Sequence, residues 1–257
     1  MSRMRQGSSG GCVPRPVPRW WRDATEPGQT LMDTLSLVLD AFAPIAGRRL
    51  VDIGCGPGAM AAALAGHGAR VTGIDPGAAA VAAARARAPD CAFEAGSAES
   101  LPFADGSFDG AVILNALHHV PDPRAALAEA ARVVVPDGRI VVVEPLAEGS
   151  FFAALRPVED ETAIRAAAQA AIAAAVASGR FRCLSDTTFV RREAFADRDA
   201  FLERVAAVDP ARRIAIRDNA AAIAAAFAAA TEIDAEGRHV LSQPLRAHVL
   251  VAVPESD

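Results

Sequence analysis

The sequence predicts an α/β fold, a three-layer sandwich in which helices cover both faces of a mostly parallel β-sheet. Short apolar runs alternate with alanine-rich segments of good helix propensity as far as Pro145. One of these runs leads directly into a glycine-rich loop, and the next ends in an aspartate. The 257 residues are enough for one such domain with a packed core and some additional elements.

The strand and loop that begin at Leu50 organise the prediction. Leu50, Val51 and Ile53 form a short apolar run typical of a strand buried on both faces. The run breaks into the loop 54–58, which contains three glycines, and residues 59–66 then have high helix propensity. Glycines remove the Cβ atoms that would keep a ligand away from the backbone, and the first amides of the helix face the same side. The loop therefore predicts a ligand-binding site.

A second strand, residues 70–74, ends in Asp75. Dinucleotide-binding folds place an acid about 20 residues past the first loop glycine, where it binds both ribose hydroxyls. Two other interpretations stay open. Asp75-Pro76 also fits a helix N-cap followed by proline at the first helical position. Gly54, Gly56 and Ala59 also fit the G-x-G-x-x-A fingerprint of nicotinamide cofactors.

The other elements of the sheet follow in order. A helix over residues 31–42, with Thr30 as a plausible N-cap, precedes the first strand. Residues 1–29 form an N-terminal arm that is expected to be partly disordered, because glycine, serine and proline are dense there. Further strands are expected at 91–94, 110–114 and 140–143, and further helices at 78–88 and after Asp122-Pro123.

Helical cap elements are expected within about 146–235, as part of a domain that spans 30–257. The helices are predicted at 159–178, 199–208 and 219–231. Residues 187–192 alternate as a strand does, and two β-rich runs, 238–242 and 246–253, predict a hairpin around Gln243-Pro244. Whether 187–192 or 239–242 is the sixth strand of the sheet stays open.

Composition excludes several classes of function. The formal net charge is −5, whereas a nucleic-acid surface needs clustered positive charge, so no nucleic-acid partner is expected. Every basic side chain except the histidines is Arg, and a chain with neither Lys nor Tyr cannot form a Lys Schiff base or use a Tyr general acid. The longest uncharged stretch of the alanine-rich region, 166–179, is too short for a membrane span, so no membrane partner is expected.

The cysteines are scattered along the chain. Cys12, Cys55, Cys91 and Cys183 have neither a disulfide framework nor the spacing of a zinc site. Residues 1–22 lack the apolar core of a secretory signal. We therefore expect a cytoplasmic location and no metal.

Four segments resemble the class I S-adenosylmethionine-dependent methyltransferases. VDIGCGPG (51–58), with the acid of GIDPG (73–77), is similar to the first two motifs of that family. Residues 96–109 are similar to its adenine-reading segment, except that Ser97 stands where the family usually has an acid, so the contact to adenine would be weaker. Residues 115–120 resemble the segment that lines the sulfonium and the acceptor, and 134–145 the last core motif.

The resemblance implies a Rossmann-like fold with a seven-stranded, mostly parallel sheet and an antiparallel C-terminal strand. It also implies S-adenosyl-L-methionine as cofactor and S-adenosyl-L-homocysteine as product. Asp52 would lie near the methionine ammonium, and Asp75 would bind the ribose hydroxyls. The remaining cofactor-binding residues that it implies are Gly54, Cys55, Gly56, Gly58, Pro76, Ser97, Ala98, Glu99, Leu114 and Asn115.

The predicted function is methyl transfer to a small-molecule acceptor by in-line displacement. The sequence contains neither the [DN]-P-P-[YFW] motif of amino-methylating nucleic-acid enzymes nor the Pro-Cys pair of cytosine-carbon enzymes. His118 is the candidate for removing a proton from an oxygen or nitrogen acceptor, whereas His119 is expected to be structural. Two alternatives stay open: a protein that binds S-adenosylmethionine without transferring its methyl group, and a nicotinamide-dependent reductase.

Overall fold

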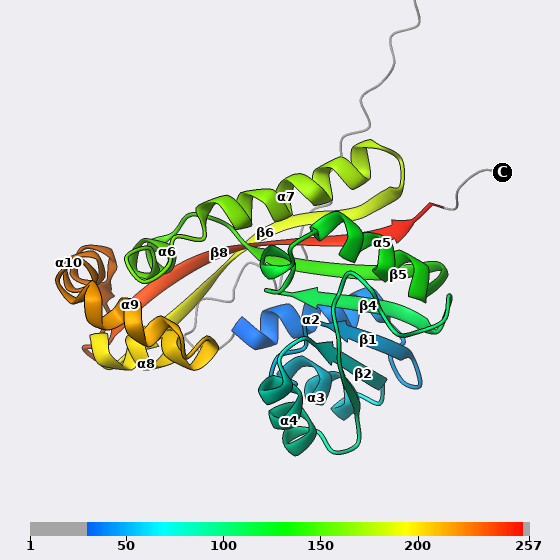
Figure 1. The fold of residues 1–257 in the computed structure, drawn as a ribbon, viewed down its shortest axis with the longest axis horizontal. Coiled ribbons are helices and arrows are strands. Elements are labelled where there is room, and N and C mark those ends of the chain that lie inside the picture. Colours follow the sequence, from blue (N-terminus) through cyan, green and yellow to red (C-terminus); the bar gives the residue numbers. More distant parts are fainter. Residues whose placement is uncertain (1–29, 254–257) are drawn as a thin grey trace, which may run out of the picture.

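The computed structural model describes residues 30–253, which form a mixed β-sheet with helices on both faces (Figure 1). The strand order is β3-β2-β1-β4-β5-β8-β6, and β7 pairs with β8 beside this path. β1 to β5 are paired in parallel, whereas β8 runs antiparallel to both β5 and β6. The predicted fold class is therefore confirmed. The strands are β1 Arg49–Ile53, β2 Arg70–Asp75, β3 Ala92–Ala95, β4 Phe108–Leu114, β5 Val134–Pro145, β6 Phe181–Phe195, β7 Glu232–Ile233 and β8 His239–Ala252.

The helices on the two faces of the sheet bury separate cores. Leu50 belongs to a core with α2, α3 and α4, whereas Val51 and Ile53 belong to a core with α5 and α7. Strand residues that alternate in direction thus supply both faces, as three layers require. The helices are α2 Thr30–Phe42, α3 Ala59–Gly66, α4 Ala78–Arg87, α5 Pro123–Val133, α6 Ser150–Leu155, α7 Thr162–Ala177, α8 Arg198–Val208, α9 Arg212–Asp218, α10 Ala220–Ala230 and the short 3₁₀ helix η1 Leu117–His119.

β6 and β8 extend past the carboxyl end of β5. β8 pairs with β5 only from Leu245 to Val251, but it pairs with β6 as far back as His239. The overhanging ribbon carries a third buried core, in which Phe201 of α8 contacts the rings of other buried phenylalanines. In Figure 1, α6, α8, α9 and α10 gather around this ribbon. They therefore lie at the edge where the parallel strands β1, β2, β4 and β5 end.

The expected hairpin around Gln243-Pro244 is wrong, because residues 239–252 form the single strand β8. Pro244 lies one residue beyond the last pair between β8 and β5, where its carbonyl accepts a hydrogen bond from the amide of Leu146 (2.9 Å). Proline is tolerated in strands at such margins of a sheet, so it does not force a turn here. Both runs that competed for the sixth strand are in the sheet: 187–192 lies within β6, and 239–242 within β8.

Several elements of the cap were not predicted. They are α6, α9 and β7. The short helix η1, which lies next to the site and outside the cap, was not predicted either. α2 begins at Thr30, so the arm 1–29 and the residue before this helix lie outside the described residues. Among the described residues, no disulfide joins Cys55, Cys91 and Cys183 to one another, and Cys12 also lies outside the described residues. From Thr30 to Val253, no helix has the length and apolar character needed to cross a membrane.

Candidate active site

The glycine loop after β1 has three backbones in the left-handed region. Gly54, Gly56 and Gly58 have φ values of 73°, 51° and 74°. A Cβ at Gly54 would lie 2.4 Å from the Cβ of Ala116, and one at Gly58 would lie 2.9 Å from the Cβ of Ala84. These two glycines allow close packing. A Cβ at Gly56 would meet no atom of the described residues within 4 Å, so the middle of the loop faces open space.

Asp75, at the end of β2, is hydrogen-bonded to this loop. Its Oδ2 accepts from the amide of Gly56 (2.9 Å) and its Oδ1 from the amide of Gly77 (2.8 Å). The N-cap of α4 is Gly77, without a side-chain cap, so the interpretation of Asp75 as the N-cap is wrong. Because β1 and β2 are parallel neighbours, their carboxyl ends bring the loop and the aspartate together, as the sequence predicted.

Asp52 is buried beneath the loop, with 2% of its surface exposed. Among the described residues, its Oδ2 has no hydrogen-bond partner. The pKa of Asp52 is raised to about 7, mainly by burial and to a smaller extent by the charge of Asp75, whereas the hydrogen bond with the backbone of Ala61 lowers it. A buried carboxylate oxygen without a partner is costly, so it fits a site that receives a cation or a donor.

We expect Asp52 to make the stability of the unliganded protein depend on pH. Its folded pKa is raised from the unfolded value of about 4, so its contribution is fully present below pH 4 and is lost as the pH rises through 7. The free energy of unfolding should therefore fall by up to about 4 kcal/mol over this range, and Asp52→Asn should remove that part of the slope. Urea unfolding of both proteins from pH 4.5 to 8 measures the difference. Parallel pH profiles would contradict the assignment.

The segment after β3 lies next to Asp75. The amide of Gly96 donates to the carbonyl of Asp75 (3.1 Å). Ser97 and Glu99 are bonded to each other, since the Ser97 hydroxyl donates to the Glu99 carboxylate (3.1 Å) and accepts from its amide (3.2 Å). The other Glu99 oxygen accepts from the amide of Asp122 (2.8 Å). Glu99 therefore connects the loop after β3 with the loop before α5, which sequence reasoning did not anticipate.

The segment after β4 is held by Glu144 of β5, a residue that sequence reasoning missed. This carboxylate, 1% exposed, accepts from the amides of Ala116 (3.0 Å), Leu117 (2.8 Å) and His118 (3.3 Å). It also contacts Nδ1 of His118. An acid that ends an otherwise apolar strand was the available signal. Glu144 thus fixes the backbone of η1 and the orientation of the buried His118 ring.

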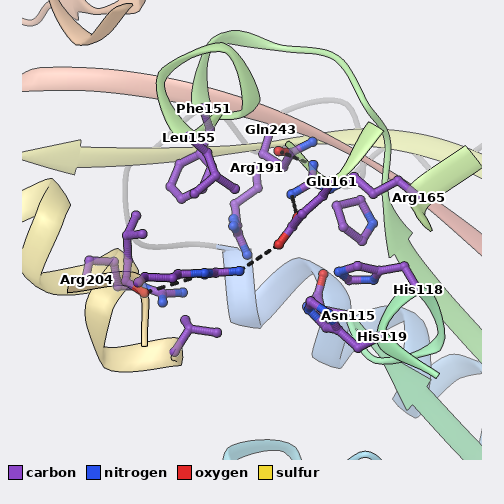
Figure 2. A pocket seen from close by; sticks show the side chains of 14 residues that line it. Asn115, His118, His119, Phe151, Leu155, Glu161, Arg165, Arg191, Arg204 and Gln243 are labelled. Atoms are coloured by element: carbon purple, nitrogen blue, oxygen red, sulfur yellow. Dashed lines mark hydrogen bonds and ion pairs between the residues drawn. The ribbon is translucent and has the colours of Figure 1, made fainter. Parts of the chain in front are cut away.

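A pocket of about 120 Å³ lies between this segment and the cap. Asn115, His118 and His119 line its sheet side, and residues of α6, β6, α8 and α9 line the other, Phe151, Arg191 and Val205 among them (Figure 2). His119 was expected to be structural, but the structure places this exposed residue at the pocket. Partial burial is the main cause that lowers its pKa, and the neighbouring His118 lowers it further.

Glu161 of the pocket is held by two arginines from the cap. One carboxylate oxygen accepts from Nε (2.8 Å) and Nη2 (2.6 Å) of Arg165, and the other from Nη2 of Arg212 (2.6 Å). His118, His119 and Glu161 offer ligand atoms within 4.8 Å of one another. The two guanidinium groups nevertheless occupy the carboxylate oxygens and bring positive charge, so this cluster is an ion-pair network and does not suit a metal ion.

The chain is similar to known methyltransferases in the region of this site. Residues 51–142 match the family described as "Methyltransferase domain". A demethylmenaquinone methyltransferase of Beutenbergia cavernae is 41% identical over 128 residues, which cover 50% of this chain and 48% of that protein. The chain spans about half the length of the curated relatives it matches.

Solved structures share the fold over most of the chain. The YcgJ protein from Bacillus subtilis has a TM-score of 0.58 at 24% identity, covering 88% of this chain and all of that one. The [4+2]-cyclase SpnF has a TM-score of 0.53 at 24% identity, covering 85% of this chain and 82% of that one. The family match thus extends over the first five strands, and the solved structures share the Rossmann-like fold around them.

Proposed function

We propose that this chain is an S-adenosylmethionine-dependent methyltransferase that transfers a methyl group to a small-molecule acceptor. One observation supports this most strongly: the pocket is lined by Asn115 and His118, directly after β4, and β4 pairs with β1, whose end carries the glycine loop. A cofactor on the loop and an acceptor in the pocket would therefore be neighbours. The acidic net charge favours small acceptors over nucleic acids.

The residues around the loop fit the cofactor that the domain implies. The partnerless oxygen of Asp52 would accept from the methionine ammonium, and the open space at Gly56 leaves room for the ligand against the backbone. Asp75 would bind the ribose hydroxyls. The adenine would contact Ser97, Ala98 and Glu99. The other residues proposed to contact the cofactor are Gly54, Cys55, Gly58, Pro76, Leu114 and Asn115.

S-Adenosylmethionine supplies a methyl group already activated by its sulfonium. The task of the chain is therefore to orient the acceptor and to exclude water. His118 adds a base. Because Glu144 contacts its Nδ1, that nitrogen carries the proton in the neutral ring, and Nε2 is the nitrogen that accepts a proton from an acceptor hydroxyl or amine.

We expect His118→Ala to slow methyl transfer by about 100- to 1,000-fold while cofactor affinity stays near that of the wild type. The reason is that His118 lines the pocket proposed for the acceptor, whereas His118 is not among the residues proposed to bind the cofactor. Single-turnover rates and calorimetry with S-adenosylhomocysteine measure the two quantities. His67→Ala, at an exposed position after α3, is the matched control. Equal losses of rate and affinity would make His118 structural.

The proposal is tested by binding and transfer together. Calorimetry with S-adenosylhomocysteine should show one site per chain, and tritiated S-adenosylmethionine should label acceptors from pools that include quinols and other phenols. The quinone-type pool is chosen because a relative is named a demethylmenaquinone methyltransferase. Tighter binding of NADH than of S-adenosylhomocysteine would overturn the proposal in favour of a reductase.

A second candidate function is binding of S-adenosylmethionine without methyl transfer. It is favoured by the fold shared with a protein titled a [4+2]-cyclase, and by Ser97 at the usually acidic adenine position. Cofactor binding with no label transferred to any pool would support this candidate over the first.

A further inference from the structure

Two of the arginines that line the pocket, Arg191 and Arg204, have no hydrogen bond to a described residue, and Arg191 is the less exposed of the two. It comes from the overhanging part of β6, and Figure 2 shows its side chain directed into the pocket. Its side chain is 15% exposed and its guanidinium lies 5.5 Å from the centre of the Phe151 ring. Glu193 lies 2.7 Å from its Nε, but no hydrogen bond joins Arg191 to any described residue, and Nε is buried without such a partner.

Two neighbouring arginines, Arg165 and Arg212, already donate hydrogen bonds to acceptors of the chain. Arg165 donates to Glu161, to the carbonyl of Leu146 and to Gln243. Arg212 donates to Glu161 and to Glu159. Their guanidinium groups are thus already occupied by acceptors of the chain. The terminal Nη1 and Nη2 of the planar Arg191 guanidinium group therefore remain available to a ligand.

The charge of Arg191 is compensated by one ion pair, with Glu193. Burial lowers its pKa, and the nearby Arg204 and Arg165 lower it further, whereas Glu193 is the group that opposes them. Glu193 is itself shared, since it lies 3.6 Å from Nε of Arg204. A buried cation surrounded by other cations is stabilised by an incoming anion.

Part of the cap side beside Arg191 is apolar, whereas the remainder carries Arg204 and the ion pairs of Glu161. Phe151 and Leu155 of α6, with Val205 and Val208 of α8, line the pocket beside Arg191. Such a surface accepts a ring or a branched hydrocarbon and does not provide for a hydrated inorganic anion. Around Arg191 the pocket therefore offers a guanidinium group, an apolar wall, and His118 on the opposite, sheet side.

We propose that the pocket selects acceptors that carry a carboxylate, with Arg191 binding the carboxylate in a bidentate contact while the apolar body of the acceptor lies against Phe151, Leu155 and Val205. This inference rests on the proposed function of the pocket as the acceptor site. Arg191 is then the specificity-determining residue, and it presents the acceptor's nucleophilic group to the side where His118 lies. Arginine and carboxylate match in planar geometry and in charge, and the low exposure of the site strengthens their interaction.

Benzoate is the probe, and benzyl alcohol is its uncharged counterpart of similar size. With saturating S-adenosylhomocysteine, ligand-observed NMR titration should show that benzoate binds the wild-type protein at least about 10-fold more tightly than benzyl alcohol does. Arg191→Gln should weaken benzoate binding by about 10- to 100-fold and leave benzyl alcohol binding and S-adenosylhomocysteine affinity unchanged. Arg182→Gln, the same change at an exposed position of β6, should alter none of the three.

The outcomes separate this inference from the proposed function. Equal binding of the two probes to the wild type, or equal binding of benzoate to wild type and Arg191→Gln, overturns the carboxylate proposal even if methyl transfer is observed. Arg191-dependent benzoate binding without any affinity for S-adenosylhomocysteine supports the anion site and overturns the proposed function. If Arg191→Gln does not fold, Arg191→Lys replaces it; a point charge without the fork should bind benzoate more weakly than the wild type does.

Discussion

Asp75→Ala is expected to weaken S-adenosylmethionine binding by about 2–4 kcal/mol, which is about 30- to 1,000-fold in Kd. Two hydrogen bonds from ribose hydroxyls to a charged acceptor would be lost. The same substitution also removes the acceptor for the amides of Gly56 and Gly77, so the loop itself would be less well ordered before the ligand arrives. Isothermal titration calorimetry with S-adenosylhomocysteine measures the affinity directly.

One further variant tests the role of the Asp75 charge, and a second serves as a control. Asp75→Asn keeps one acceptor oxygen for a loop amide but removes the charge, and it should lie between wild type and Asp75→Ala in affinity. Asp90→Ala, which removes an exposed carboxylate from the turn after α4, should bind as the wild type does. If Asp75→Ala binds S-adenosylhomocysteine as tightly as the wild type does, Asp75 does not bind the ribose hydroxyls.

The sheet and the glycine loop could be predicted because their signals are local. The apolar run at Leu50 breaks at once into glycines, and Asp75 ends the next strand, so a parallel sheet brings both to one edge without knowledge of any distant contact. The same logic predicted β4 and the segment after it. The register of each strand follows from alternation of buried residues on the two faces.

The cap could not be predicted in the same way. Gln243-Pro244 reads locally as a turn, but the side-chain amide of Gln243 donates to the carbonyls of Leu146 and Glu148, and this distant pairing keeps the chain in one strand. The third core also forms from residues far apart, such as Phe151, Phe201 and Phe227. The local sequence around each phenylalanine is compatible with several tertiary arrangements, so it does not predict which residues meet in this core.

The polar side of the pocket was missed for the same reason. Glu161 meets Arg165 four residues on, which a helix pattern can suggest, but it meets Arg212 only because the fold brings the start of α9 close to the start of α7. Arg191 alternates in a strand and looks like a solvent-facing residue in sequence. Its burial depends on the cap helices that cover it, so only the folded arrangement identifies it as a residue that lines the pocket.

Glu144 makes four polar contacts in the site. Three consecutive backbone amides and the ring of His118 converge on one buried carboxylate. Amides that turn toward the core after β4 have no other acceptor among these contacts, so the path of η1 depends on this side chain. The charged form is stabilised by several donors at once, which is the arrangement in which a buried carboxylate contributes favourably.

Glu144→Ala is therefore expected to destabilise the fold by about 3–5 kcal/mol, because it leaves several donors buried without an acceptor. A loss of this size is a large part of the total stability of a typical domain, about 5–15 kcal/mol, and urea unfolding would show it as a lower midpoint.

Glu144→Gln keeps one oxygen for the amides and should cost less stability. Its amide nitrogen presents a donor to His118 in place of a carboxylate oxygen, so the orientation or tautomer of the ring changes, and methyl transfer should fall more than cofactor affinity does. Glu148→Gln, at an exposed position just beyond β5, is the matched control and should alter neither quantity. If Glu144→Ala unfolds at the urea concentration of the wild type and transfers methyl groups at the same rate, Glu144 neither orders η1 nor positions His118, and the base would have to be sought elsewhere in the pocket.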